Sequence, residues 1–356
     1  MFNRFNRFTP AIIVLILTAA FLTGCSFKNP VTIPVLLKTE DASREQLMNE
    51  VNRFAAVNSI HAKMYLKFED NSFAEFGSKE VYRSADGDVV VQRPSKIYMR
   101  VQVPVIKTDV AQMTSDGTNF RVAILQDDCS GKCKKFVIGS NNADYSKLQK
   151  ELKSADLGSG KGIKENVTSF ANLRPQHFTD AMLVRPIDAA NVYTQSTIFQ
   201  VEEDEAQQKK SAIRKVTRGY YLLDEFTKGA SGNLAIVRRF WFDRVGGIRL
   251  ARQQIFDTHG EVASDILYGK PGNLTDTGEY TNLPLEITVT RPKEKYSMKL
   301  TYQTPETVTI GKTFPETAFE LENTWGLQEV DLDKMLREVS AGQPQSNNQN
   351  SAARAQ

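Results

Sequence analysis

Short runs in which apolar and polar residues alternate fill most of this chain. The clearest is 60–68, where Ile60, Met64, Leu66 and Phe68 share one side of the alternation and charged or polar residues take the other. A period of two is that of a strand with one buried face. Further strand-like runs occur at 79–82, 89–92, 97–103, 109–113, 120–125, 136–138, 192–201, 234–242, 248–256, 262–268, 285–289 and 296–302. Because the runs are short and closely spaced, the pattern predicts an antiparallel meander.

Turn residues separate many of these runs. We expect turns at Asp86-Gly87, Asp116-Gly117, Gly246-Gly247, His259-Gly260, Pro271-Gly272 and 292–294. An acidic run at 202–205 and a basic run at 209–218 predict a solvated hairpin tip whose strand ends are paired by charge. Glycine and aspartate favour tight turns because they tolerate the backbone angles that turns need.

Four segments have the apolar spacing of helices: 43–56, 143–152, 175–183 and 327–339. The first begins with Ser43 and Gln46, which are spaced as a capping box. The prediction is a mainly β (α+β) protein with a large antiparallel curved sheet, or unclosed β-barrel, capped by a few α-helices. We expect one domain over 41–340, since no linker longer than the loop at 154–172 interrupts it, and a disordered tail at 341–356.

Charge argues against one class of partner. The 356 residues include 45 Lys and Arg against 42 Asp and Glu, a net charge of +3. No basic excess is available to hold a phosphate backbone, so we expect no nucleic-acid partner.

The first residues have the order of a secretory signal peptide. Arg4 and Arg7 precede an apolar run from Ala11 to Leu22, which would rise only ~18 Å as a helix against a hydrocarbon core of ~30 Å. An uncleaved membrane span is therefore the weaker reading. Leu22-Thr23-Gly24-Cys25 resembles the bacterial lipobox. The resemblance implies a signal peptide at 1–24, acyl chains such as palmitate on Cys25, and a tether over 25–40.

The next residue and the remaining cysteines refine this picture. Ser26 is not the aspartate that tends to retain such lipoproteins in the inner membrane, which favours the outer membrane. Cys129 and Cys133 form an even pair in an oxidising compartment, at a hairpin tip, and predict a disulfide. A metal or redox pair is the rival reading, with neither a second ligand pair nor C-x-x-C spacing to support it.

Catalytic signatures are weak. His61, His177 and His259 lie on a predicted strand, helix and turn without nucleophile motifs or metal-ligand spacing. Gly160-Lys161 lacks the flanking residues of a phosphate-binding loop. We expect no catalytic residue, no metal and no cofactor.

Several motifs, taken in order, resemble the LolA/LolB family of periplasmic lipoprotein carriers and receptors. They are Ser84–Gly87 leading to Arg93-Pro94 and Ile97–Val101, then Val103–Ile106, Ser115–Phe120, and the segment Leu173–Leu183. The resemblance implies an unclosed barrel capped by helices, whose apolar concave face holds acyl chains. It also implies that Leu173–Leu183 is a lid helix.

Two sets of residues are candidates for that function. Aliphatic and Met side chains suit an acyl cavity, because an unpaired polar group against hydrocarbon costs ~1–3 kcal/mol. The expected cavity residues are Ile60, Met64, Leu66, Phe68, Ile97, Met99, Val101, Phe178 and Met182; the alternative is an ordinary packed core. Val105 and Ile106 stand where the receptors have a protruding membrane-contact loop; the alternative is a strand that continues through a bulge.

The sequence therefore predicts a non-enzymatic lipoprotein anchored on the periplasmic face of the outer membrane. Its expected partners are the membrane, the acyl chains of a lipid or lipoprotein, and a periplasmic carrier protein. The alternative is an envelope-stress sensor or assembly factor in which the same half-barrel binds a protein. A hydrolase would need a cluster of titratable residues that the sequence does not indicate.

Overall fold

The computed structural model describes residues 33–70, 80–81, 84–126, 134–145, 148, 175–229, 232–275, 280 and 282–341. The chain divides into two compact units, a larger one of residues 38–200 and 218–356 and a smaller one of residues 1–37 and 201–217. The leader, Cys25, Cys129, Cys133 and the tail beyond 341 lie outside the described residues, so the predictions made for them remain predictions.

The described residues form 17 strands, all within one sheet. The strands are β1 Val35–Leu36, β2 Ser59–Asp70, β3 Glu80–Val81, β4 Ala85–Gln92, β5 Lys96–Gln102, β6 Asp109–Ser115, β7 Asn119–Ile124, β8 Phe136–Ser140, β9 Val192–Glu203, β10 Lys215–Lys228, β11 Leu234–Asp243, β12 Arg249–Phe256, β13 Val262–Gly272, β14 Leu283–Arg291, β15 Tyr296–Tyr302, β16 Thr309–Ile310 and β17 Glu329–Asp331.

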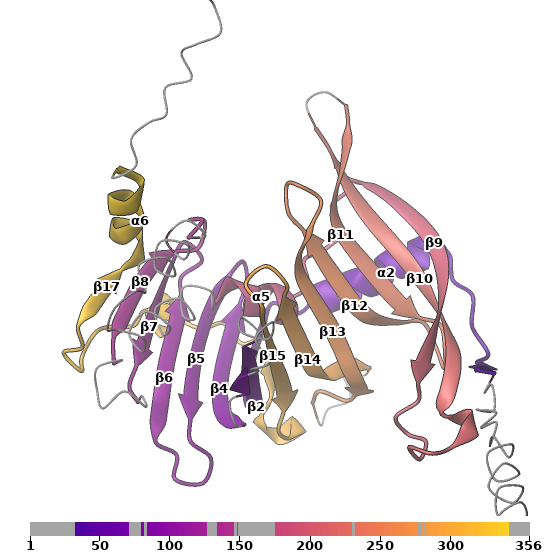
Figure 1. The fold of residues 1–356 in the computed structure, drawn as a ribbon, viewed down its shortest axis with the longest axis horizontal. Coiled ribbons are helices and arrows are strands. Elements are labelled where there is room, and N and C mark those ends of the chain that lie inside the picture. The colour runs from indigo at the N-terminus through magenta and orange to yellow at the C-terminus, as the bar shows by residue number, and fades with distance from the viewer. Residues whose placement is uncertain are drawn as a thin grey trace, which may run out of the picture. The chain divides into compact units, whose positions relative to one another are not determined.

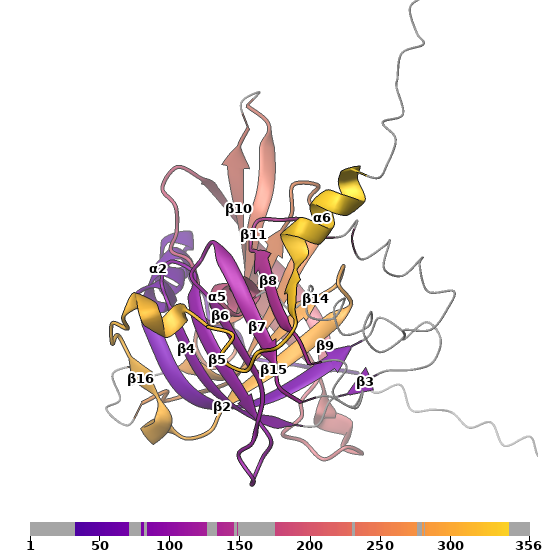
Figure 2. The same ribbon diagram turned by 90° about the vertical axis from the view of Figure 1, so that its left-hand side faces the viewer.

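Strand β2 joins two meanders. Strands β4 to β8 follow one another on one side of it, and β15 back to β9 follow on the other. Leu66 thus lies opposite both Ala85 on β4 and Leu300 on β15. Strand β1 with β10 and strand β17 with β8 pair in parallel. Figure 2 shows β2 as a long, bent strand, and the predicted mainly β, unclosed curved sheet is confirmed.

Two of the predicted turns are wrong, for one physical reason. Asp86-Gly87 lies inside β4, and Pro271-Gly272 lies at the end of β13, paired with β14. A Cβ on Gly87 would come within 2.6 Å of Leu66 Cδ1, and one on Gly272 within 2.6 Å of Leu285 Cδ1. These glycines are inside strands because a leucine of the neighbouring strand occupies the space.

Other turns are as predicted. Gly117, Gly246, Gly247 and Gly260 all have positive φ angles in connections between strands, a conformation that glycine adopts without a steric penalty. The 14-residue strand β10 has no counterpart among the predicted runs beyond its basic start. Its centre, Tyr220 to Leu223, is buried on both faces, so it shows no alternation.

Three α-helices accompany the sheet in the described residues: α2 Arg44–Ala55, α5 Gln176–Met182 and α6 Leu332–Ala341 (Figure 1). The predicted capping box of α2 is confirmed. Ser43 Oγ accepts a hydrogen bond from the backbone N–H of Gln46, and Gln46 Oε1 accepts one from the backbone N–H of Ser43. The helix predicted at 143–152 lies mostly outside the described residues. The last predicted helix begins later than expected, because residues 329–331 pair with β8 as β17.

The main core lies between the sheet and the helices. Helix α2 contributes Leu47, Val51 and Phe54, and α5 contributes Phe178 and Met182. Both sets join one contiguous cluster of buried apolar side chains from β2 to β15. No helix among the described residues is long and apolar enough to cross a membrane.

Within the smaller unit, β1 pairs with the first residues of β10, so that Val35 lies opposite Val216. The segment between β9 and β10 contains a short 3-10 helix at Ala212–Arg214. Arg214 Nε donates to Glu203 Oε2 at 2.9 Å, one charge pair of the kind predicted for this charged tip.

Candidate functional site

Seven of the nine predicted cavity residues lie on strands β2 and β5 of the sheet. Ile60, Met64 and Leu66 on β2 and Ile97 and Met99 on β5 are each no more than 4% exposed. The residues that alternate with them along each strand point to the opposite face of the sheet; Tyr65, for example, is 51% exposed. Because β4 lies between β2 and β5, the two apolar rows form one continuous surface.

Helix α5 packs on this surface. Phe178 is fully buried and Met182 is 7% exposed, and both belong to the same cluster as the sheet residues. The other two predicted cavity residues, Phe68 and Val101, are partly buried against that cluster. The structure therefore brings all nine together, with helix side chains in contact with strand side chains.

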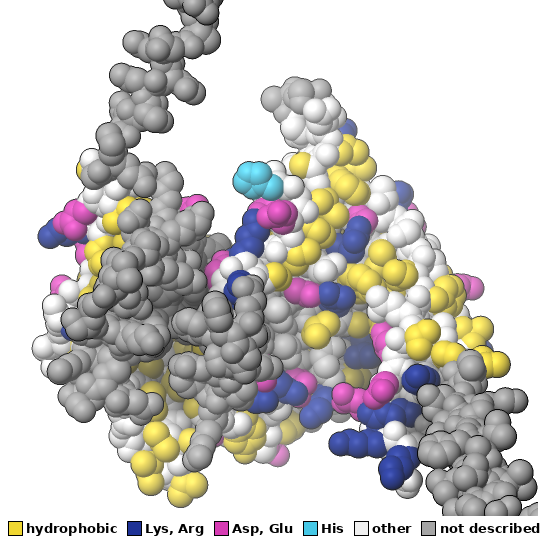
Figure 3. Space-filling view, in the orientation of Figure 1, with side chains coloured by type: hydrophobic (Ala, Val, Ile, Leu, Met, Phe, Trp, Pro, Cys, Tyr) yellow, Lys and Arg dark blue, Asp and Glu magenta, His cyan; other side chains and the backbone are white. Residues whose placement is uncertain are grey.

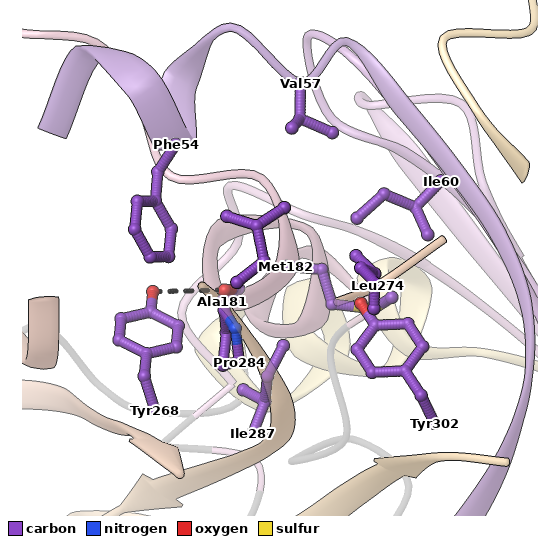
Figure 4. A pocket seen from close by; sticks show the side chains of 11 residues that line it. Phe54, Val57, Ile60, Ala181, Met182, Tyr268, Leu274, Pro284, Ile287 and Tyr302 are labelled. Carbon is purple, nitrogen blue, oxygen red and sulfur yellow. Dashed lines mark hydrogen bonds between the residues drawn. The ribbon is translucent and has the colours of Figure 1, made fainter. Parts of the chain in front are cut away.

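A narrow cavity remains between α2, α5 and strands β13 to β15. Its volume is about 20 Å³, room for roughly one water molecule. Figure 4 shows Phe54, Met182 and Ile287 directed into it, and Tyr268 donating a hydrogen bond of 3.1 Å to the Ala181 carbonyl. The lining residues are Phe54, Val57, Ile60, Ala181, Met182, Tyr268, Leu274, Leu283, Pro284, Ile287 and Tyr302. The side chains that line this cavity thus leave little free volume in it.

Two arginines hold the backbone that follows α5, which we call the strap (residues 183–186). Arg93 Nη2 donates to the Val184 carbonyl at 2.6 Å and Nη1 to the Leu183 carbonyl at 3.5 Å. The same side chain donates from Nε to the Val57 carbonyl at 3.0 Å, beyond the end of α2. One guanidinium therefore ties the strap to the end of α2.

Arg238 holds the other half of the strap from β11. It donates to the Arg185 and Pro186 carbonyls at 2.8 and 2.9 Å, and its Nε forms an ion pair with Glu225. Glu225 Oε1 also accepts from Tyr193 Oη at 2.8 Å and from an asparagine amide at 2.7 Å. This ion pair is buried, with side-chain exposures of 6% and 2%.

Burial and neighbouring charged or hydrogen-bonding groups shift the pKa values of Glu225, Tyr193 and Asp180. Burial raises the pKa of Glu225, but the hydrogen bonds and positive charge of Arg238, together with the other donors, outweigh it and leave that pKa lowered. Burial, with a smaller contribution from Glu225, raises the pKa of Tyr193 to about 12. Burial also raises the pKa of Asp180 in α5, and Arg185 is 3.6 Å from it.

Val105 and Ile106 stand at the tip of the β5–β6 hairpin, 91% and 69% exposed. In Figure 3 hydrophobic side chains gather at the lower left, where Figure 1 draws this hairpin. Val105 has φ +72°, a conformation that is rare for a β-branched residue. A hydrogen bond of 3.0 Å from the Lys107 amide to the Val103 carbonyl closes the turn. The alternative of a strand continuing through a bulge with both residues buried is wrong.

The histidines are dispersed over the structure. His61 Nε2 lies 2.8 Å from Asp88 Oδ1, and His177 Nδ1 lies 2.8 Å from Tyr296 Oη. The side chain of His259 is 81% exposed. No group of three residues able to hold a metal ion occurs in the part of the chain that the structure describes.

No family model and no curated protein matches this sequence. Solved structures that are similar to it include the following three. A LolA superfamily protein from Nitrosomonas europaea has 9% identity and a TM-score of 0.38, covering 79% of this chain and 99% of that one. A DUF1329 family protein from Desulfovibrio piger has 10% identity and a TM-score of 0.37, covering 80% and 97%. A putative outer membrane lipoprotein-sorting protein domain from Vibrio parahaemolyticus has 10% identity and a TM-score of 0.37, covering 78% and 95%.

At these identities and TM-scores the likeness says nothing about a ligand, so function is inferred below from the residues of this chain.

The two strap arginines were not among the sequence candidates. Arg93 was visible only as part of the Arg93-Pro94 motif. Arg238 carried a clearer signal, because it falls on the same side of the alternation as Ile236, Phe240 and Phe242. A charged residue in an apolar register indicates a buried, paired group.

Proposed function

We propose that this chain is a lipid-anchored envelope protein that takes the acyl chains of a lipid or lipoprotein onto the apolar face under α5 at the outer membrane. The observation that carries the proposal is that helix α5 covers this apolar face. A continuous aliphatic and Met-rich surface is covered by a seven-residue helix, and polar bonds hold the strap that follows it. The proposed activity is binding and transfer, without a chemical step.

Acyl chains would enter by replacing the side chains of α5. Removing Phe178 and Met182 from the core would cost roughly 1.5–3 kcal/mol each, whereas each buried methylene contributes about 0.8 kcal/mol. An acyl chain that buries about eight methylenes would therefore offset the loss of both side chains. Methionines, such as Met64 and Met99, suit a surface that must repack against an irregular ligand.

The β5–β6 loop would contact the bilayer during delivery. Inserting Val105 and Ile106 would contribute roughly 1.5–3 kcal/mol each, enough to favour contact but not to anchor the protein. The acyl chains proposed on Cys25 would supply the stable anchor, and a periplasmic carrier protein would supply the cargo.

Photo-crosslinking in the full chain would test the proposal. Benzoylphenylalanine would replace Phe178, which is buried in α5, and separately Tyr65, which faces away from the core on β2. We expect acyl-containing adducts from position 178 and none from position 65. The absence of lipid at position 178 in cells with a normal level of the protein would contradict acyl binding under α5.

A second candidate function is supported by the small volume of the cavity. The cavity under α5, with a volume of about 20 Å³, also suits a sensor or assembly factor that binds a protein partner on its outer surface. In that case crosslinks would join position 65, or other exposed positions, to one protein, and position 178 would give only crosslinks within the chain.

A further inference from the structure

A second, polar cavity lies beside the apolar one. Its volume is about 390 Å³, within the range of roughly 300–1,000 Å³ for small-molecule sites. Its walls come from α2, the start of β10, the β11–β12 turn and the facing ends of β13 and β14. The lining residues are Glu50, Arg53, Arg218, Asp243, Val245, Gly246, Gly247, Ile248, Arg249, Pro271 and Asn282.

Two guanidinium groups converge on one buried carboxylate in this cavity. Arg218 Nη1 and Arg249 Nη2 donate to Asp243 Oδ2 at 2.7 and 2.9 Å, and the Val245 amide donates to Oδ1 at 3.0 Å. The Asp243 side chain is 2% exposed, whereas those of Arg218 and Arg249 are 22% and 27% exposed. Asp243 therefore holds the two arginines together while leaving part of each accessible.

The charge balance favours an anion. Three arginines, Arg53, Arg218 and Arg249, line the cavity together with two carboxylates, Glu50 and Asp243. Arg53 donates to both oxygens of Glu50 at 2.8 Å. The cavity thus has a net charge of about +1, presented by guanidinium groups whose fork of donors matches phosphate oxygens.

Residues adjacent in sequence line the polar cavity and the apolar cavity. Arg53 lines the polar cavity, and the next residue of α2, Phe54, lines the apolar cavity. At the start of β14, Asn282 likewise lines the polar cavity and Leu283 lines the apolar cavity. The two cavities are thus lined by neighbouring residues of the same segments, an arrangement that suits a ligand with a polar and an apolar end.

We propose that the polar cavity binds the phosphate group of an anionic lipid whose acyl chains lie on the apolar face. This inference rests on the proposed function for the position of the acyl chains, but the recognition of phosphate depends on Arg218 and Arg249 alone. The site would make the protein selective for lipids with a net negative headgroup.

Native mass spectrometry of the full-length protein, released from a nonionic detergent, would test it with three lipids and one ion. The probes are dihexanoyl phosphatidic acid, dihexanoyl phosphatidylcholine, uncharged monolauroylglycerol and inorganic phosphate. The variants are Arg218→Gln and Arg249→Gln, each of which leaves Asp243 with one arginine. Arg239→Gln is the matched control, because Arg239 pairs with Asp224 outside the cavity. Circular dichroism would verify the fold of each variant.

We expect the natural protein to bind phosphatidic acid about tenfold more tightly than phosphatidylcholine. Arg218→Gln and Arg249→Gln should each abolish most of that preference, Arg239→Gln should retain it, and monolauroylglycerol binding should not change. Equal binding of the two phospholipids by the natural protein, or an equal loss in Arg239→Gln, would overturn the inference.

Failure of the proposed function gives a different result. If no lipid binds but inorganic phosphate binds in an Arg249-dependent manner, acyl binding is refuted. The cavity is then a site for a free anion, and the assignment to a lipid is overturned.

Discussion

The buried pair of Arg238 and Glu225 offers a sharp test of how the strap is held. Replacing Arg238 with Met keeps most of the side-chain volume but removes the cation and the donors to the Arg185 and Pro186 carbonyls. Glu225 then remains 2% exposed without a positive partner. Breaking a buried pair in this way costs about 3–5 kcal/mol, and at roughly 2 °C per kcal/mol we expect Tm to fall by about 6–10 °C.

The destabilisation should depend on pH. In the natural protein the pKa of Glu225 is lowered from its ordinary value of 4.5, so its stabilising effect is present above that value and is lost as pH falls through the lowered pKa. Without Arg238, burial dominates and raises the pKa of Glu225. The loss in Arg238→Met is then largest above the raised pKa, and it shrinks as the carboxyl takes up a proton. We expect a larger fall in Tm at pH 8 than at pH 5.

Thermal unfolding of Arg238→Met, Glu225→Gln and the double variant would measure the effect, and hydrogen exchange would report on the strap amides. Glu225→Gln removes the buried charge, so the double variant should recover part of the stability lost in Arg238→Met. A loss below about 1 kcal/mol, or a double variant no more stable than Arg238→Met, would refute the assignment of a buried charge pair.

Three further predictions concern other parts of the fold. Gly87→Ala should lower the free energy of unfolding by about 1–3 kcal/mol, because its Cβ would overlap Leu66; urea unfolding would measure this, and a neutral effect would contradict the close packing. Ile106→Asp should weaken sedimentation with lipid vesicles by about tenfold or more, and unchanged sedimentation would exclude the loop from membrane contact. Lys293→Gln should raise the pKa of Asp257 from about 2 towards 3.8 in an NMR titration, whereas no change would assign the low value to the backbone amides instead.

The sequence predicted the elements whose local pattern and tertiary role agree. The alternation at 60–68 became β2, and Ser43 with Gln46 marked the start of α2, because one buried face and one capping box are visible without knowledge of any neighbour. The turn at Gly117 was predicted for the same reason, since the tight turn itself requires the positive φ angle of this glycine.

The errors arose where a distant residue decides the structure. Gly87 indicated a turn, yet Leu66 on the neighbouring strand is what requires a glycine there. Tyr220 to Leu223 are buried on both faces, so β10 lacks the alternation that identifies a half-exposed strand. The nine cavity candidates belong to, or pack against, one apolar cluster, and their role as a cavity stays a prediction. The volume of the cavity beneath α5 depends on packing between helix and sheet, which periodicity does not reveal.

The position of β2 has a consequence for how the chain acquires its structure. Its partner on one side, β4, begins 15 residues after β2 ends, but its partner on the other side is β15, where Leu66 meets Leu300. Until the last quarter of the chain arrives, β2 presents an unpaired edge beside an apolar face, the arrangement most prone to pairing with a wrong strand. The protein's most vulnerable moment during synthesis is therefore the interval between making its central strand and making the strand that completes it.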